Sequence, residues 1–194
     1  MENTSIPQSI SSIPSKEESL TLLYEYVQSQ SLRTHCENVA KCMMWHANKF
    51  GIAENEKTTW FATGILHDFD YEKFPDWENG GHPFKGCEIL KEMGVSEIIT
   101  RAILSHANYS GVSRDSLMEK TLFAVDELSG FVTAASLVRP DKDIRNVEVK
   151  SILKRMKDKA FARAVSREDI TEGAKLLEIT LEEHIQNVIT ALSN

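Results

Sequence analysis

The chain has 194 residues, of which 41% are hydrophobic, and its formal net charge at pH 7 is -7. A chain of this length and composition can bury one full-sized core, so we expect a single domain. The negative charge disfavours binding to a nucleic acid polymer or to an anionic membrane, and no apolar run approaches the roughly 18 residues of a membrane-spanning helix.

The first residues and the cysteines bear on localisation. Residues 1–15 are rich in Ser, Pro and Asn, without the basic start and apolar core of a secretory signal. We expect a disordered tail over 1–15 and one helical domain over 16–194. Cys36, Cys42 and Cys87 are odd in number and lack metal-type spacing. This pattern favours core packing for each cysteine and a cytoplasmic location.

Hydrophobic periodicity predicts α-helix along most of the chain. In the first half, helices are predicted over 19–28, 32–50, 54–68, 83–93 and 96–106. Residues 70–81 hold Pro75, Gly80 and Gly81 among several charges, which predicts a loop. In the second half, a long buried helix is predicted over 116–138 and amphipathic helices over 143–159 and 171–192. No stretch alternates with period two for long, so the predicted fold class is all-α, a helical bundle.

The most informative feature is the pair His67-Asp68, which follows the apolar run Gly64-Ile65-Leu66. An imidazole and a carboxylate are costly to bury there unless something binds them, and a divalent metal is the usual solution. Nitrogen and oxygen donors together suit zinc, manganese, iron or nickel better than calcium. Neighbours on a helix point about 100° apart. The pair therefore flanks a site rather than gripping one ion face-on, and Asp68 is free to bridge two ions.

Four further residues could complete such a site, and each has a structural alternative. His35 lies close to the apolar face of its predicted helix, where a hydrogen-bonded, partly buried histidine is common. His82 stands in a Gly-rich loop and could be solvated, and His106 could be a cation at a helix C-terminus. Asp126 lies within the apolar stretch 122–128, so its carboxylate needs either a metal or a buried salt bridge.

The order of His35, His67-Asp68 and Asp126 resembles that of the HD-domain superfamily of metal-dependent phosphohydrolases. The resemblance covers roughly residues 20–135. It implies an HD-domain-like helical bundle whose ligand-bearing core spans about 30–135, followed by C-terminal helices over 140–194. It also implies that His35, His67, Asp68 and Asp126 bind metal.

Two more segments resemble the two-metal branch of that superfamily. They are residues 81–90, which contain His82-Pro83, and residues 99–106, which end in His106. If both histidines bind, the cofactor is two divalent transition-metal ions (Mn, Fe, Ni, Co or Zn). One ion would be held by His35, His67 and Asp126 and the other by His82 and His106, with Asp68 between them. If they do not bind, the site holds one ion.

The resemblance implies a phosphohydrolase that uses metal-activated water on a small phosphorylated metabolite or nucleotide. The cyclic-dinucleotide branch fits poorly, because its Gly-Tyr-Pro signature is absent after Asp68. Two alternatives stay open: an HD-fold di-iron oxygenase, because ligand type alone permits iron, and a non-catalytic nucleotide-binding sensor. Apolar positions on the C-terminal helices would permit a homodimer.

Several residues near the His-Asp pair are candidates for catalysis beside Asp68 itself. Lys85, three residues after His82, is a candidate phosphate contact. Asp70 and Lys73 are candidates for a proton shuttle or a phosphate contact.

The remaining charged signal is basic. Residues 139–163 carry nine basic and four acidic residues, a net +5 inside a chain of -7. This segment is either a cationic face that collects an anionic substrate or a solvated amphipathic helix. His46 is expected at the surface or beside the ligands, and His184 is expected in solvent.

Overall fold

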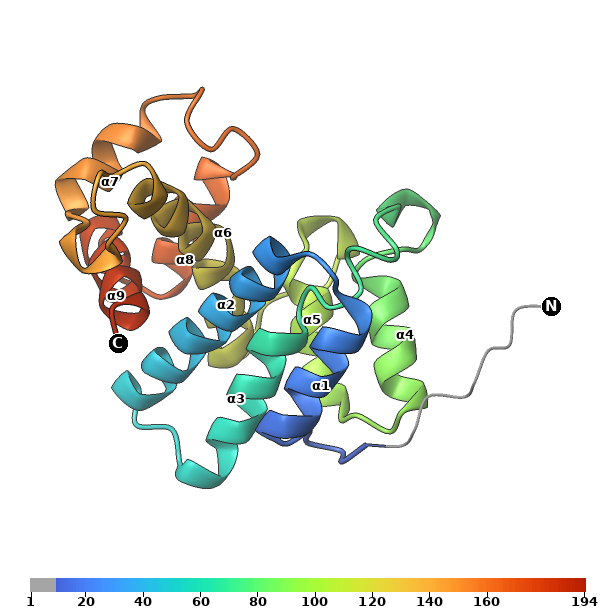
Figure 1. Cartoon of the computed structure of the whole chain (residues 1–194). Helices are drawn as coiled ribbons and strands as arrows, with labels where there is room; N and C mark the ends of the chain where they lie inside the picture. Colours follow the sequence, from blue (N-terminus) through green and yellow to red (C-terminus); the bar gives the residue numbers. More distant parts are fainter. Residues whose placement is uncertain (1–9) are drawn as a thin grey trace.

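The computed structural model describes residues 10–194, and every regular element in that range is helical (Figure 1). The α-helices are α1 (Lys16–Tyr26), α2 (Gln30–Lys49), α3 (Glu54–Leu66), α4 (Phe84–Glu92), α5 (Glu97–His106), α6 (Leu117–Leu137), α7 (Val149–Met156), α8 (Arg167–Leu176) and α9 (Leu181–Leu192). Short 3-10 turns are η1 (Trp77–Asn79), η2 (Asn108–Ser110) and η3 (Ile144–Asn146). The predicted all-α class is confirmed.

Local side chains set where the two longest helices begin. Before α2, the Ser29 hydroxyl accepts a hydrogen bond from the backbone N–H of Leu32. Before α6, Ser116 and Glu119 form a reciprocal capping box. Such caps satisfy N–H groups that the first helical turn leaves free. They position the two helices that carry His35 and Asp126.

Helix α2 lies between α3 and α6 (Figure 1) and contributes residues to two apolar clusters. It packs against α3 on one side and α6 on the other, and α6 packs against α5 and α8. Val39 and Met43 belong to the cluster shared with α6 and α9, whereas Cys36 and Ala40 belong to the cluster shared with α1, α3, α4 and α5. The metal-binding candidates lie at the junction of these two clusters.

The three cysteines are buried and unpaired, as expected for core residues. Burial raises the pKa of the Cys87 thiol to about 12. Such thiols are poor nucleophiles and poor metal ligands. Of the helices that the structure describes, none combines the length and hydropathy required to cross a membrane.

Part of the expected tail is ordered. The backbone N–H of Ser96 donates to the carbonyl of Ser12, 2.8 Å away, which attaches the chain before α1 to the start of α5. The prediction of disorder over 1–15 is therefore wrong for residues 10–15. Residues 1–9 lie outside the described part of the chain.

The predicted C-terminal helices are too long. The helix predicted over 171–192 is two helices, because Glu178 adopts a left-handed conformation (φ 57°) that ends α8. Thr180 then caps α9. The helix predicted over 143–159 is reduced to η3 and the eight residues of α7.

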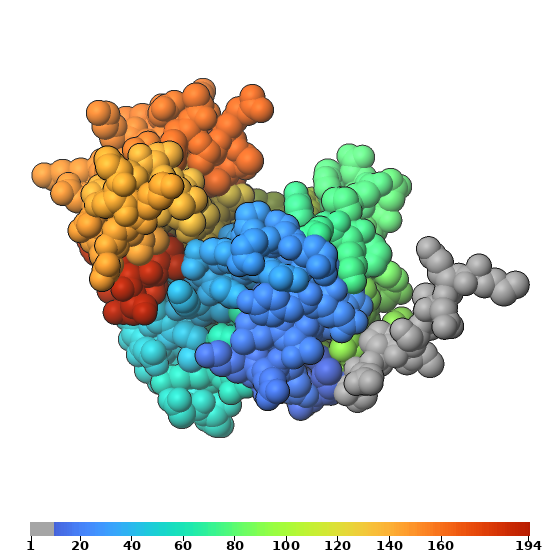
Figure 2. All heavy atoms as spheres, viewed as in Figure 1, coloured from blue at the N-terminus to red at the C-terminus, as the bar shows by residue number. Residues whose placement is uncertain are grey.

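The basic segment 139–163 forms a lobe at one side of the molecule, drawn in orange in Figure 2. Two of its arginines are neutralised locally, since Arg139 pairs with Asp141 and Arg145 with Asp143.

Candidate metal centre

The six predicted ligands come together from different parts of the chain. His35 lies on α2, Asp126 on α6 and His106 at the end of α5, while the other three flank α3 and α4: His67, Asp68 and His82. Five of them line a cleft with a volume of about 350 Å3. The sixth, His67, is fully buried beside it.

The two oxygens of Asp68 face two different pairs of histidines. Oδ2 lies 3.6 Å from Nε2 of both His35 and His67. Oδ1 lies 3.3 Å from Nε2 of His82 and 3.5 Å from Nε2 of His106. The carboxylate thus stands between two separate donor groups, each of which could hold an ion.

Asp126 completes the first donor group from the opposite side. Its Oδ1 lies 2.9 Å from Nε2 of His35 and 3.5 Å from Nε2 of His67, and the two Nε2 atoms are 3.2 Å apart. Neighbouring donors around one ion with bonds of about 2.1 Å lie roughly 3.0–3.4 Å apart. The spacing and the imidazole and carboxylate chemistry therefore fit a divalent transition metal such as Mn, Fe, Co, Ni or Zn.

Backbone carbonyls orient two of the histidines. His67 Nδ1 donates to the carbonyl of Gly64, 2.8 Å away, and His106 Nδ1 donates to the carbonyl of Ile103. These bonds leave each Nε2 lone pair free on the side that faces Asp68. Gly64 also lets α3 approach α2 closely, because a Cβ there would lie 2.7 Å from the Cα of Ala40.

Asp70 orients His82. The buried carboxylate accepts from His82 Nδ1 at 2.7 Å through Oδ1 and from the backbone N–H of Gly86 at 2.7 Å through Oδ2. Only glycine fits at position 86, since a Cβ would lie 2.6 Å from Asp70 Cγ. Asp70 was expected to shuttle protons or contact phosphate, but both of its oxygens are engaged. In the structure Asp70 lies behind His82 and positions its ring.

The two predicted lysines are not brought to the cleft. Lys85 Nζ lies 2.6 Å from Oε2 of Glu88 on the exposed side of α4. Lys73 Nζ lies 3.8 Å from the ring centroid of Tyr26. Neither lysine lines the cleft.

The carboxylates and imidazoles strongly influence one another. Burial disfavours the charged form of Asp68, but His67, His106 and His82 outweigh it and hold the pKa of its carboxyl below the usual range. Burial likewise opposes protonation of His67, yet Asp68 and Asp126 raise its pKa to about 9. A proton and a metal ion compete for the same Nε2 lone pair, so metal binding must release protons.

Cleft residues that the sequence interpretation missed include Glu127, Asp169 and Tyr109. Burial and the neighbouring Asp126 raise the pKa of Glu127 to about 7. Burial and the carboxylate of Asp68 raise the pKa of Tyr109 to about 12, so its phenol keeps a proton and donates to the carbonyl of His82. Glu127 had a sequence signal, because it is a second acidic residue in an apolar helix.

His46, expected at the surface or beside the ligands, and His184, expected in solvent, both lie fully buried in the core. His46 Nδ1 donates to the carbonyl of Cys42 and His184 Nε2 to that of Ala124. The sequence pattern could not reveal this, because α9 covers α2 and α6 only in the folded chain.

The basic segment 139–163 contributes none of the described residues that line the cleft. The cleft lining thus gives no support to the hypothesis that this segment collects substrate. The alternative, a solvated amphipathic helix, fits the exposed Lys150, Lys154 and Lys157.

The model of the HD domain family matches residues 32–131, about half of the chain. The chain therefore belongs to the HD-domain family, which is largely one of metal-dependent phosphohydrolases. Among curated proteins and among solved structures, no significant match to this chain was found. All six predicted ligands lie within the matched range.

Proposed function

We propose that this protein is a metal-dependent phosphohydrolase that cleaves a phosphoester bond in a small phosphorylated metabolite or nucleotide. The observation that carries the proposal is the division of the Asp68 oxygens between two pairs of histidines. Two divalent ions bound there would activate a water and neutralise charge on the phosphoryl oxygens.

The cleft lining supports water as the nucleophile. Among the described residues that line it, none is a serine or a cysteine. His35, His67 and Asp126 form one donor group and His82 and His106 the other, while Asp68 joins the two groups. These six side chains would hold the ions, and Asp70 would keep His82 aimed at its position.

The charge of the cleft also points to bound cations. Asp126, Glu127 and Asp169 line it, and within residues 10–194 no lysine or arginine does. A phosphate dianion would be repelled by these carboxylates unless positive charge were supplied. A volume of about 350 Å3 lies at the small end of known ligand sites and suits a small substrate rather than a polymer.

The test begins with metal analysis of protein purified without added metal. Manganese-loaded and chelator-treated protein are then assayed for phosphate release from nucleoside monophosphates, sugar phosphates and p-nitrophenyl phosphate. We expect turnover only with metal, and none above background in Asp68→Asn. Oxygen uptake by iron-loaded protein without phosphate release would instead indicate the oxygenase, and tight nucleotide binding without turnover would indicate the sensor.

A further inference from the structure

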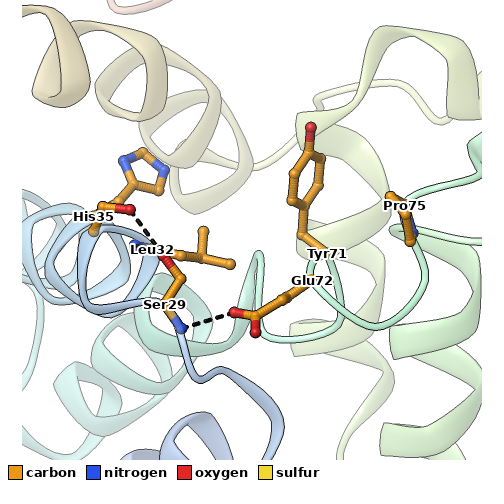
Figure 3. A pocket seen from close by; sticks show the side chains of 7 residues that line it. Ser29, Leu32, His35, Tyr71, Glu72 and Pro75 are labelled. Atoms are coloured by element: carbon orange, nitrogen blue, oxygen red, sulfur yellow. Dashed lines mark hydrogen bonds between the residues drawn. The ribbon is translucent and has the colours of Figure 1, made fainter.

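A second hollow adjoins the metal-binding cleft. This side pocket has a volume of about 510 Å3 and is shown in Figure 3. His35 and Tyr71 line both hollows, and the other walls of the side pocket are Ser29, Ser31, Leu32, Glu72 and Pro75. The pocket therefore borders the site at which a phosphoryl group would be held.

The two shared residues lie where the hollows meet. Figure 3 shows His35 and Tyr71 on opposite sides, with Leu32 between them. The Tyr71 ring also lies against the ring of His82, with 5.2 Å between centroids. A group attached to a phosphoryl at the metal centre can thus extend past Tyr71 and over Leu32.

The walls of the side pocket are mainly apolar. Leu32, Pro75 and the Tyr71 ring supply apolar surface, and within residues 10–194 Glu72 is the only acidic side chain in the lining. Among the described residues, no lysine or arginine lines the pocket. Apolar walls favour burial of an apolar group, whereas a second anion there would lose solvation and meet a like charge.

Glu72 also builds the pocket. Its Oε2 accepts from the backbone N–H of Gln28 at 3.1 Å and of Ser29 at 2.9 Å. These bonds join the connection between α1 and α2 to the segment after Asp68, as the dashed line to Ser29 in Figure 3 indicates. The pocket walls from two distant parts of the chain are thereby held together.

We propose, on the basis of the proposed function, that the side pocket binds the leaving alcohol of the phosphoester and selects an uncharged, partly apolar alcohol over an anionic one. In the reaction, water forms a new bond to phosphorus and the bond between phosphorus and the ester oxygen breaks. The products are inorganic phosphate and the alcohol, which takes up a proton. Leu32 is the central specificity-determining residue.

The test measures binding of phosphonates, which cannot be hydrolysed, to manganese-loaded protein by calorimetry. The three probes are methylphosphonate, benzylphosphonate and 4-carboxybenzylphosphonate. We expect benzylphosphonate to bind about tenfold more tightly than methylphosphonate, because its ring reaches apolar walls. The added carboxylate should weaken binding by about tenfold. Equal dissociation constants for the methyl and benzyl probes would overturn the proposal.

A positive charge introduced into the pocket should raise the affinity for the carboxylated probe, and a misfolded variant could not show such a gain. Leu32→Lys should make 4-carboxybenzylphosphonate bind at least as tightly as benzylphosphonate. Ile98→Lys is the matched control, because Ile98 is 62% exposed on α5 and lines neither hollow. Leu32→Ala should reduce the preference for benzyl over methyl without reversing the charge preference. An equal shift in both lysine variants would count against the pocket.

The corresponding phosphate esters separate this inference from the proposed function. If the phosphonates are discriminated as expected but no ester is hydrolysed, the side pocket binds the organic group and the hydrolase proposal is wrong. If the esters are hydrolysed without regard to the alcohol, the hydrolase proposal stands and the side-pocket inference is wrong. If no phosphonate binds and no ester is hydrolysed, both are wrong.

Discussion

Two groups of histidines in this protein differ in what surrounds them. Those of the candidate metal centre, namely His35, His67, His82 and His106, point Nε2 at Asp68 or Asp126. His46 and His184 are as buried as His67, but each has one ring nitrogen with no hydrogen-bond partner among the described residues. Helices α2 and α6 contact both groups of histidines. Neither the helix that a histidine contacts nor its burial therefore distinguishes a candidate ligand from a core histidine.

The two groups of histidines also differ in pKa, because their neighbours differ. Despite burial, carboxylates raise the pKa of His67 to about 9. Burial without such neighbours lowers the pKa of His46 and of His184 to about 4. A buried histidine thus becomes a candidate ligand when a carboxylate faces the same space.

The sharpest test of this contrast replaces one histidine of each kind. His67→Ala should lose bound metal and reduce phosphate release by about a thousandfold or more, because it removes a buried donor from the shared centre. Elemental analysis, a hydrolysis assay and circular dichroism measure the three effects. His46→Ala should keep the metal and lose stability instead. Full metal content and turnover in the His67 variant would show that the core assignment is wrong.

The second test concerns the two sides of Asp68. His82→Ala or His106→Ala should lower bound metal from about two ions toward one per chain and reduce turnover by orders of magnitude. Titration with manganese, followed by elemental analysis after desalting, gives the stoichiometry. A content of one ion in wild type and variants alike would rule out the binuclear site and leave a single-ion mechanism.

A smaller effect on metal binding is expected at Asp70, which lies behind His82. Asp70→Asn should weaken metal binding by about 10–100-fold, because an amide cannot accept from both His82 Nδ1 and the Gly86 N–H. Competition with a metal-sensitive dye measures the affinity. Glu56→Gln, an equivalent loss of a carboxylate at an exposed position on α3, is the control. Equal affinities in the two variants would contradict the positioning role.

The core histidines should make stability depend on pH. His46 and His184 both have folded-state pKa values of about 4, below the unfolded value of about 6.5. Their neutral forms therefore favour folding above pH 6.5, and this contribution is lost as pH falls from 6.5 toward 4. At pH 5 the loss is on the order of 1–2 kcal/mol for each histidine. Urea unfolding at pH 7 and pH 5 should show a smaller difference for His46→Leu than for wild type, and an unchanged difference would refute this account.

The smallest effect is expected at Lys85. The sequence interpretation made it a phosphate contact, but the structure pairs it with Glu88 outside the cleft lining. Lys85→Ala should change kcat/KM by less than about twofold, as expected for a surface substitution. A loss above about tenfold would show that this lysine reaches the substrate.

Much of the site was predictable because its signals are local. A histidine next to an aspartate after an apolar run, and an aspartate within a buried helix, are chemically costly unless a ligand binds them. Those contexts, together with the family's order of residues, predict that His67, Asp68 and Asp126 share one site, and the structure brings the three side chains together. Helical periodicity in the same way identified an all-α fold.

What the tertiary structure decided depends on residues that are distant in sequence. Asp70 lies behind His82 because Gly86, 16 residues later, leaves room for its carboxylate. His184 looked solvated because its burial comes from α6, which lies about 60 residues earlier along the chain. The side pocket likewise joins Ser29 to Glu72. Sequence periodicity reports which face of an element is apolar, but the partner of that face is chosen by packing, and packing decided which polar groups meet.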